Sequence, residues 1–213
     1  MNHRPVPAKV LDVTPRHALL LGFAGPAGCG KSSAAALVAS RPGWERLSFA
    51  QPLRDLLLAL HPAWDQWHLG PGKDLTPADG GLSPREQMRA VGDWVKGYDP
   101  GFFTAIGRHH LGRLLLRGVH VAIDDVRYEA EARLIRDLGG CVVHVSRTDI
   151  QFRRDHESEL GIEPEPGDLH LRNWGSLRSL HDELHHTLHA ALLRRATQGE
   201  HGPTYGLAVA MSR

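Results

Sequence analysis

Short runs of apolar residues recur along the chain and are separated by segments with helical character. The three clearest runs cover residues 18–24, 119–123 and 141–145, and each has the length of a single strand. A further short strand is expected at 44–49, and a weaker, alternating one at 168–172. Strands that are apolar throughout are typical of parallel sheets buried on both faces. The pattern predicts a three-layer α/β fold with about five parallel strands flanked by helices.

The segments between these strands have the composition and the end signals of helices. Ser83 is expected to cap one helix, with Pro84 in its first turn and Glu86 as the partner in a capping box. Two glycines, Gly139 and Gly140, are expected to end another helix. Helices are therefore predicted over residues 33–39, 53–60, 84–91, 98–117, 129–138 and 176–195.

Residues 25–32 read GPAGCGKS, which matches the G-x-x-x-x-G-K-[ST] pattern of a phosphate-binding loop. The match lies between an apolar strand and a helix, as the pattern requires. Its glycines allow several backbone N–H groups to face one anion, and the helix N-terminus adds a partial positive charge. We expect Lys31 to be partly exposed and to reach the β- and γ-phosphates of ATP, and Ser32 to bind Mg²⁺. A glycine-rich turn that binds nothing is the alternative. The predicted nucleotide-binding residues here are Gly25, Ala27, Gly28, Cys29, Gly30, Lys31, Ser32 and Ser33.

Two neighbouring carboxylates, Asp124 and Asp125, follow the apolar run at 119–123. A carboxylate at the end of a buried parallel strand lies at the same sheet edge as the phosphate loop, where it can hold a Mg²⁺-bound water. Both aspartates are therefore candidate metal residues together with Ser32, and the sequence does not say which of them serves the metal. Asp is also common in turns, so an ordinary turn is the competing interpretation.

The composition is ordinary for a soluble protein, and it argues against a membrane protein or a strongly electrostatic nucleic-acid binder. The 213 residues are 41% hydrophobic, carry a formal net charge of +1 and include two cysteines. No apolar run approaches the roughly 18 residues that span a bilayer, and the start lacks the apolar core of a signal peptide. We therefore expect a cytoplasmic protein without a disulfide framework. The triplet His185, His186 and His189 has metal-ligand spacing but no obvious further ligands, so a solvated helix face is favoured.

Both ends of the chain and one internal segment depart from the alternating pattern. Residues 1–16 are rich in proline and basic residues and are expected to form a flexible arm, and 197–213 a flexible tail. Residues 61–82 are rich in Gly, Pro, Trp and Asp, and such a stretch inside a domain is usually functional or mobile. We expect it to belong to a substrate-binding insert over about 61–98, within a domain that spans 17–196.

Several later motifs occur in an order that resembles a known family. They are Phe49-Ala50-Gln51-Pro52-Leu53-Arg54, Gly72-Lys73-Asp74, Pro84-Arg85-Glu86, Asp125-Val126-Arg127 with Glu131, Gly139-Gly140 and His156-Glu157-Ser158-Glu159. With the phosphate loop, they resemble the deoxynucleoside monophosphate kinases of bacteriophages over about residues 17–195. This P-loop kinase family also includes animal-type phosphomevalonate kinase, to which segments 99–103 and 157–159 are similar. The resemblance implies a P-loop NTPase fold. It also implies a kinase that uses ATP and Mg²⁺ to convert a deoxynucleoside 5′-monophosphate to the diphosphate for DNA precursor synthesis.

The resemblance also implies roles for individual residues. Transfer to a phosphate acceptor needs cations that bring two anions together, not a strong base. Arg153 and Arg154 lie within 147–160, where nucleoside monophosphate kinases place their lid, and Asn173 with Trp174 could bracket adenine. A plain surface position is the alternative for each arginine, and a helix-entry turn for the Asn-Trp pair. The implied catalytic residues are Lys31, Asp125, Arg127, Arg153 and Arg154. The implied substrate-binding residues are Lys73, Arg85, Lys96, Arg127, Glu131, His156 and Glu159.

Two positions depart from the family pattern. The segment Gly92-Asp93-Trp94-Val95-Lys96 stands where members often have Gly-Thr-Glu followed shortly by Arg, and lysine lacks the bidentate fork of arginine. This departure leaves the geometry of acceptor binding open. In Tyr128-Glu129-Ala130-Glu131, the position before the last Glu is commonly Asn in the family.

Other functions compatible with these motifs rank lower. A P-loop kinase could instead phosphorylate a hydroxyl, such as a 5-hydroxymethyl group on a pyrimidine, free or in DNA, with Asp124 or Asp125 as the base. DNA is a partner only under that interpretation; otherwise the partner is a small nucleotide, no membrane is involved, and a homodimer is left open. Another small-molecule phosphate kinase or a non-catalytic nucleotide-binding switch ranks below these. The sequence does not identify the base of the acceptor.

Overall fold

The computed structural model describes residues 18–77, 80–148 and 161–198, with side chains up to residue 193. Within the chain, two compact units are distinguished. Unit 1 combines the chain up to Arg46 with the chain from His109 onward, and unit 2 is the uninterrupted segment Leu47–Arg108, which contains the whole predicted insert. The following predicted features lie outside the described residues: the arm at 1–16, nearly all of the tail at 197–213, most of the lid at 147–160, and Arg153, Arg154, His156 and Glu159.

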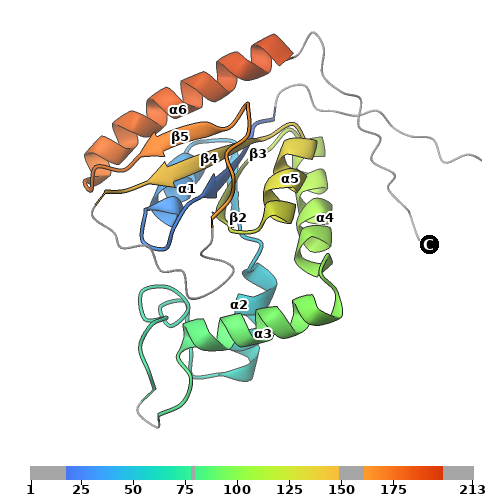
Figure 1. Cartoon of the computed structure of the whole chain (residues 1–213), viewed down its shortest axis with the longest axis vertical. Coiled ribbons are helices and arrows are strands. Elements are labelled where there is room, and N and C mark those ends of the chain that lie inside the picture. The colour runs from blue at the N-terminus through green and yellow to red at the C-terminus, as the bar shows by residue number, and fades with distance from the viewer. Residues whose placement is uncertain (1–17, 78–79, 149–160, 199–213) are drawn as a thin grey trace, which may run out of the picture. The chain divides into compact units, whose positions relative to one another are not determined.

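A five-stranded sheet forms the core of unit 1 (Figure 1). The strands lie in the order β2-β3-β1-β4-β5. Strand β1 pairs in parallel with both β3 and β4, and β4 pairs in parallel with β5. All five predicted strands are present, and the α/β fold class is confirmed. Their bounds are β1 (Leu20–Ala24), β2 (Trp44–Leu47), β3 (His120–Val126), β4 (Cys141–Ser146) and β5 (Leu169–Arg172).

Helices cover both faces of this sheet. The helices within the described ranges are α1 (Lys31–Ala39), α2 (Gln51–Leu60), α3 (Pro84–Tyr98), α4 (Phe102–Leu116), α5 (Glu129–Asp137) and α6 (Leu177–Gln198). Helices α1 and α6 share one core with the sheet, a buried cluster that includes Val38 of α1, Leu184 of α6 and Phe23 of β1. Helix α5 covers the opposite face, where a Cβ at Gly22 would overlap the side chain of Ile135. Because both faces are buried, β1 is apolar along its whole length.

Helix α3 begins as predicted but ends later. The Glu86 carboxylate accepts a hydrogen bond from the Ser83 backbone N–H at 2.8 Å, which confirms the capping box. The helix was expected to end near Val91 and continues to Tyr98. The residue that follows the expected end, Gly92, is buried, and Leu53 of α2 packs beside it. A glycine inside this helix therefore serves helix packing and does not terminate the helix.

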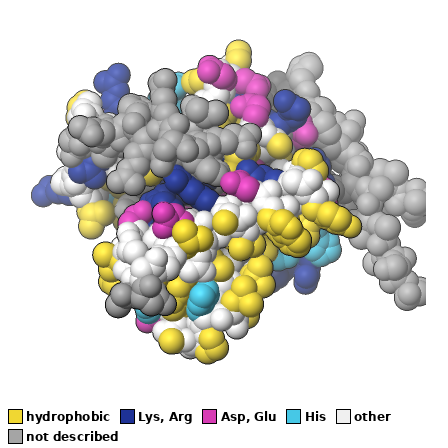
Figure 2. Space-filling view, turned by 60° about the horizontal axis from the view of Figure 1, so that its bottom comes forward, with side chains coloured by type: hydrophobic (Ala, Val, Ile, Leu, Met, Phe, Trp, Pro, Cys, Tyr) yellow, Lys and Arg dark blue, Asp and Glu magenta, His cyan; other side chains and the backbone are white. Residues whose placement is uncertain are grey.

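The connection between α2 and α3 folds onto the two helices within unit 2. Nε2 of His61 lies 2.7 Å from the side-chain oxygen of Gln87, and the rings of His61 and Trp64 stack with centroids 4.0 Å apart. A Cβ at Gly72 would overlap the ring of Trp67, so the indole lies directly on the backbone there. As predicted, the described part of this connection consists of turns without a helix or strand. Figure 2 shows hydrophobic side chains in patches on the surface; exposed ones on α2 and α3 are Leu56, Leu60, Trp94 and Tyr98.

A network of charged side chains fixes the segment that leads into β5. The buried carboxylate of Asp168 lies 2.7 Å from Nη2 of Arg136 on α5 and 2.9 Å from Nε2 of His144 on β4. Nη1 of Arg136 donates to Glu129 at 3.0 Å and to Glu165 at 2.7 Å. Burial alone would raise the pKa of Asp168, but hydrogen bonds from Arg136, the Glu165 amide and His144 outweigh it and lower the pKa to about 2. This network joins α5, β4 and the start of β5.

We predict that Asp168→Asn lowers the free energy of unfolding by about 2 kcal/mol at pH 7, because Arg136 and His144 lose a charged partner. Ionised Asp168 stabilises the native state above the unfolded pKa of 3.8, and this contribution is lost as the pH falls toward the native value of about 2. In urea unfolding, the difference in the free energy of unfolding between wild type and variant should have its full value at pH 7 and should decrease below about pH 4. Asp182→Asn, at an exposed position of α6, is the control. A difference in the free energy of unfolding that stays constant as the pH falls would contradict the prediction.

Candidate active site

The segment between β1 and α1 is a tight loop whose backbone requires glycine. Gly25, Gly28 and Gly30 have φ angles of 138°, 81° and 106°, which L side chains rarely adopt. Gly30 is the N-cap of α1, and its carbonyl accepts a hydrogen bond from the backbone N–H of Ala34 at 2.9 Å. Anion-binding nests at helix N-termini are built from backbone of this type. The loop could therefore bind a phosphate group.

Lys31, the first residue of α1, is only 7% exposed, so the expectation that it is partly exposed was wrong. Its Nζ donates to the carbonyl of Gly25 at 2.6 Å and to that of Pro26 at 2.8 Å. The ammonium group lies directly beside these two carbonyls of its own loop, which accept from two of its three N–H donors, and Sγ of Cys29 lies 3.9 Å from Nζ. Ser32 and Ser33 on the same turn are exposed, so their hydroxyl groups remain accessible.

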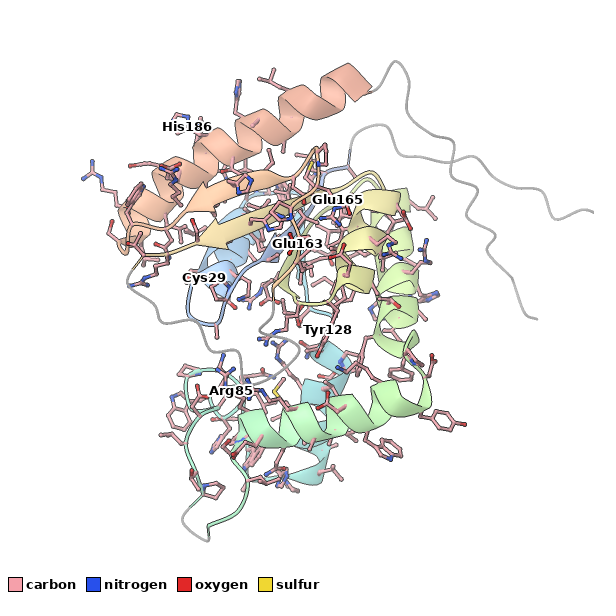
Figure 3. The ribbon with its side chains drawn as sticks, in the orientation of Figure 1. Cys29, Arg85, Tyr128, Glu163, Glu165 and His186 are labelled. Carbon is pink, nitrogen blue, oxygen red and sulfur yellow. The ribbon has the colours of Figure 1, made fainter. Side chains whose placement is uncertain are left out.

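The loop packs on the ends of β4 and β5. A Cβ at Gly25 would overlap the carbonyl of Val145, and the side chain of Cys29 is fully buried in the core (Figure 3). Asn173, which follows β5, is buried and donates from Nδ2 to the Cys29 carbonyl at 2.9 Å. Trp174, next in the chain, is 58% exposed. The two residues expected to bracket adenine therefore differ, because Asn173 turns into the fold and Trp174 faces solvent.

The two aspartates lie inside β3, where the sheet is irregular. Strand β3 runs further than predicted, to Val126, so Asp124 and Asp125 are strand residues and do not follow the strand. The pairing of β3 with β1 shifts by one residue between Gly22 and Ala24, opposite the aspartates. An extra residue of this kind forms a bulge and interrupts the regular alternation of side chains between the two faces. The directions of the two aspartates therefore do not follow from strand periodicity.

Asp124 forms an ion pair with a residue that sequence reasoning missed. Its side chain is buried, and Oδ2 accepts from Nε of Arg46 on β2 at 2.8 Å and also from Nη2. The Arg46 side chain is 44% exposed, so solvent reaches the pair from one side. Arg46 reaches Asp124 because β2 lies beside β3 in the sheet, and the sequence does not show that these two strands are adjacent.

Asp125 lies close to a second buried carboxylate, Glu131 of α5. Oε2 of Glu131 accepts from the backbone N–H of Arg127 at 2.8 Å and from that of Tyr128 at 3.1 Å, in the turn labelled by Tyr128 in Figure 3. Burial is the main cause that raises the pKa of Glu131, and the charge of Asp125 raises it further. The two amides oppose them, and the pKa is about 8. Glu131 thus shapes the turn after β3 and fixes the backbone of Arg127, whose side chain is half-buried.

Unit 2 contains the predicted acceptor-binding residues Lys73, Arg85 and Lys96. The carbonyl of Lys73 accepts from the backbone N–H of Arg85 at 2.8 Å, and the Arg85 guanidinium makes two hydrogen bonds to Asp74. Arg85 lies at the start of α3 (Figure 3), and Lys96 lies three helical turns further along the same face, with its Nζ 3.1 Å from Asp93. The structure therefore joins Lys73 to Arg85 through a backbone hydrogen bond and places Lys96 on the same face of α3 as Arg85.

Magnesium would need few protein ligands at a site of this type. Mg²⁺ is commonly held by one or two carboxylates together with waters and substrate phosphates. Across the described residues, no group of three or more His, Cys, Asp or Glu side chains could hold a metal ion, and this includes the histidines of α6. The oxygen atoms of Ser32 and of the aspartates in β3 are hard donors that suit Mg²⁺. None of the helices in the described ranges is long and apolar enough to cross a bilayer.

Two comparisons with known proteins bear on this site. Residues 109–184 match the sequence profile of a family described as deoxynucleotide monophosphate kinase. The matched segment contains Asp124, Asp125, Arg127, Glu131 and Asn173. The chain is also 32% identical over 158 residues to a protein of Acanthamoeba polyphaga mimivirus named as a deoxynucleotide monophosphate kinase. That alignment covers 68% of this chain and 82% of the mimivirus protein.

We predict that Arg46→Ala lowers the free energy of unfolding by about 2 kcal/mol, because the buried carboxylate of Asp124 loses this ion pair. The expected loss is below that of a fully buried pair, since solvent reaches Arg46. Urea unfolding at pH 7 measures it. Arg133→Ala, at an exposed position of α5, removes the same side chain without touching this pair and is the control. If both variants lose the same stability, the ion pair does not stabilise the site.

Proposed function

The chain belongs to the deoxynucleotide monophosphate kinase family and is a phosphotransferase; from this premise we propose that it transfers the γ-phosphoryl group of ATP to a deoxynucleoside 5′-monophosphate. The product would be the diphosphate, a precursor for DNA synthesis. One observation supports ATP as the phosphoryl donor. The loop in which Gly25, Gly28 and Gly30 have left-handed backbone conformations lies directly before α1. This backbone suits a chain of phosphate groups, while the family supplies the acceptor class.

On the donor side, the amides of the loop and of the first turn of α1 would bind the phosphates. Lys31 would exchange the carbonyls of Gly25 and Pro26 for phosphate oxygens. The ammonium group has good acceptors before and after this exchange, so no buried cation is left unsatisfied. The exposed ring of Trp174 is the better candidate for stacking on adenine, because its Nε1 donates to Glu183 at 3.3 Å and thereby orients the ring.

For magnesium, we assign Ser32 and Asp125. The charge of Asp124 is already neutralised by the Arg46 guanidinium, so of the two aspartates we assign the metal role to Asp125. The ion would neutralise charge on the phosphates during transfer. Asp125 would orient a water of the ion, and Glu131 keeps the turn behind it in place through the amides of Arg127 and Tyr128.

Arg127 is the residue that we propose to join donor and acceptor. The residue before it, Val126, pairs with Ala24, the last residue of β1 before the phosphate loop. Arg127 therefore leaves the sheet at the same edge as the loop. A guanidinium there can bridge the acceptor phosphate and the transferring group, whose charge it would stabilise most in the transition state.

The acceptor would be held by cations of unit 2 and of the lid. Arg85 and Lys96 lie on one face of α3, and Lys73 lies in the loop before this helix; the carboxylate partners of Arg85 and Lys96 are exchangeable for a phosphate. Residues outside the described ranges complete the proposal: Arg153 and Arg154 as lid cations within 147–160, and His156 with Glu159 as acceptor contacts. Because donor and acceptor are both phosphates, this set of cations replaces a general base.

The proposal is tested by product analysis with γ-labelled ATP, Mg²⁺ and a panel of deoxynucleoside monophosphates, with single-stranded and duplex DNA included. We expect labelled diphosphate from one or more monophosphates. Lys31→Ala should lower the rate at least about a hundredfold. It should remain folded, since two hydrogen bonds to the loop are worth about 2 kcal/mol. Label on a hydroxymethyl pyrimidine or on DNA would identify a hydroxyl kinase, and label only in inorganic phosphate would identify a slow hydrolase.

We predict that Arg127→Ala lowers kcat/KM for the monophosphate by about a hundredfold or more, a loss of roughly 3 kcal/mol of transition-state stabilisation, and changes ATP binding little. Arg127→Lys should recover only part of the activity, because an ammonium group cannot replace the planar fork. Steady-state kinetics with each substrate varied, together with ATP binding by calorimetry, makes the test. Arg133→Ala again controls for the loss of a surface cation. A change in kcat/KM of less than about threefold would rule out the acceptor role.

A further inference from the structure

We propose that Asn173 is a positioning residue for the phosphate loop and does not bind the adenine base. Its side-chain amide holds the Cys29 carbonyl, and this bond sets the direction of the Gly30 N–H at the start of α1. The inference rests on the proposed function, since it gives the loop a phosphate to bind.

The contact joins two parts of the chain that are far apart in sequence. Nδ2 of Asn173 donates to the Cys29 carbonyl at 2.9 Å across 144 residues, and both residues are buried. Asn173 is itself fixed at two further points. Its backbone N–H donates to the Ser146 carbonyl at 2.8 Å, which extends the pairing of β4 with β5, and its Oδ1 accepts from the Gly175 N–H at 3.0 Å. The amide is therefore held in one orientation by the sheet and by the turn into α6.

The orientation of the Cys29 carbonyl determines that of the next amide. In a planar trans peptide, the C=O and the following N–H point in opposite directions. Because Asn173 holds the Cys29 carbonyl, the N–H of Gly30 points away from Asn173. Gly30 is the N-cap of α1, so this amide lies at the positive end of the helix, where a phosphate would bind.

The packing around Gly30 supports the same role. A Cβ at Gly30 would overlap Nδ2 of Asn173, so the side chain lies against the loop backbone itself. Gly30 also has a φ of 106°, which the contact helps to maintain. Both ends of the Asn173 amide have protein partners, and the residue is only 6% exposed. A base would have to reach a side-chain amide that is almost completely buried, whereas Trp174 beside it is exposed.

The first test compares a ligand that has a base with one that has none. Dissociation constants of Mg²⁺-ATP and of Mg²⁺-tripolyphosphate are measured for the wild type and for Asn173→Ala. If Asn173 acts through the loop, both constants should rise by the same factor, about tenfold or more. If the constant for ATP rises and that for tripolyphosphate does not, Asn173 contacts the base and the inference is wrong. If neither constant rises, the inference is also wrong.

The second test needs no nucleotide and uses the buried thiol of Cys29 as a reporter. In a Cys141→Ala background, Cys29 is the only cysteine of the chain, so its alkylation rate reports how often the loop opens. Asn173→Ala and Asn173→Asp should both label at least about tenfold faster than the background protein. The Asp variant retains the acceptor for the Gly175 N–H and loses the donor to Cys29, so it isolates the proposed bond.

A matched control separates loop opening from general loss of stability. Ile135→Val removes a methylene group from the opposite face of the sheet, and its stability is measured alongside the Asn173 variants. Labelling in the Asn173 variants should exceed that in Ile135→Val at equal loss of stability; equal labelling would overturn the inference. If wild-type protein binds no tripolyphosphate, the labelling result decides. If labelling behaves as expected but no monophosphate is phosphorylated, the proposed function fails and the positioning of the loop by Asn173 stands.

Discussion

The structure depends on one constraint at the end of β1. The backbone must turn sharply there while it stays packed against the residues at the ends of β4 and β5. Gly25 meets the Val145 carbonyl, and Gly30 meets the side chain of Asn173, at the points where a Cβ would lie. Both glycines also have positive φ angles. Lack of space and left-handed backbone are separate requirements, and each of them alone disfavours any other residue. The loop is therefore defined as much by the strands beneath it as by its own sequence.

Features that depend on local sequence could be predicted, and features that depend on tertiary neighbours could not. The apolar run of β1, the glycine pattern of the loop and the capping box at Ser83 are local, and the structure contains all three. The end of α3 was missed because Gly92 is buried where Leu53 packs beside it. The burial of Lys31 was missed because its acceptors are carbonyls of the loop, which no pattern of side chains indicates. The role of each candidate residue in binding or transfer still depends on experiment.

The acidic end of β3 shows how one extra residue gives two neighbouring aspartates different surroundings. The register shift between Gly22 and Ala24 breaks the strand alternation at this point. Asp124 is neutralised by Arg46, while Asp125 lies beside Glu131. Burial and the nearby charge of Asp125 raise the pKa of Glu131 to about 8, so Glu131 adds little negative charge at neutral pH. A protonated Glu131 limits the negative charge that would repel the phosphates accompanying a cation at this end of β3.

The bond between Asn173 and Cys29 has a consequence for the order of folding. The phosphate-loop motif is complete within the first 32 residues, yet the strands beside β1 begin at His120 and Cys141, and the amide that holds the loop comes at residue 173. Contacts of such wide sequence separation form late, because closing a long loop costs chain entropy before any contact is gained. A nascent chain therefore carries the motif long before the loop has its support. Nucleotide binding should therefore begin only after the last strand has docked. The C-terminal third of the chain thus determines when the site becomes able to bind, although the sequence motif of the site lies near the N-terminus.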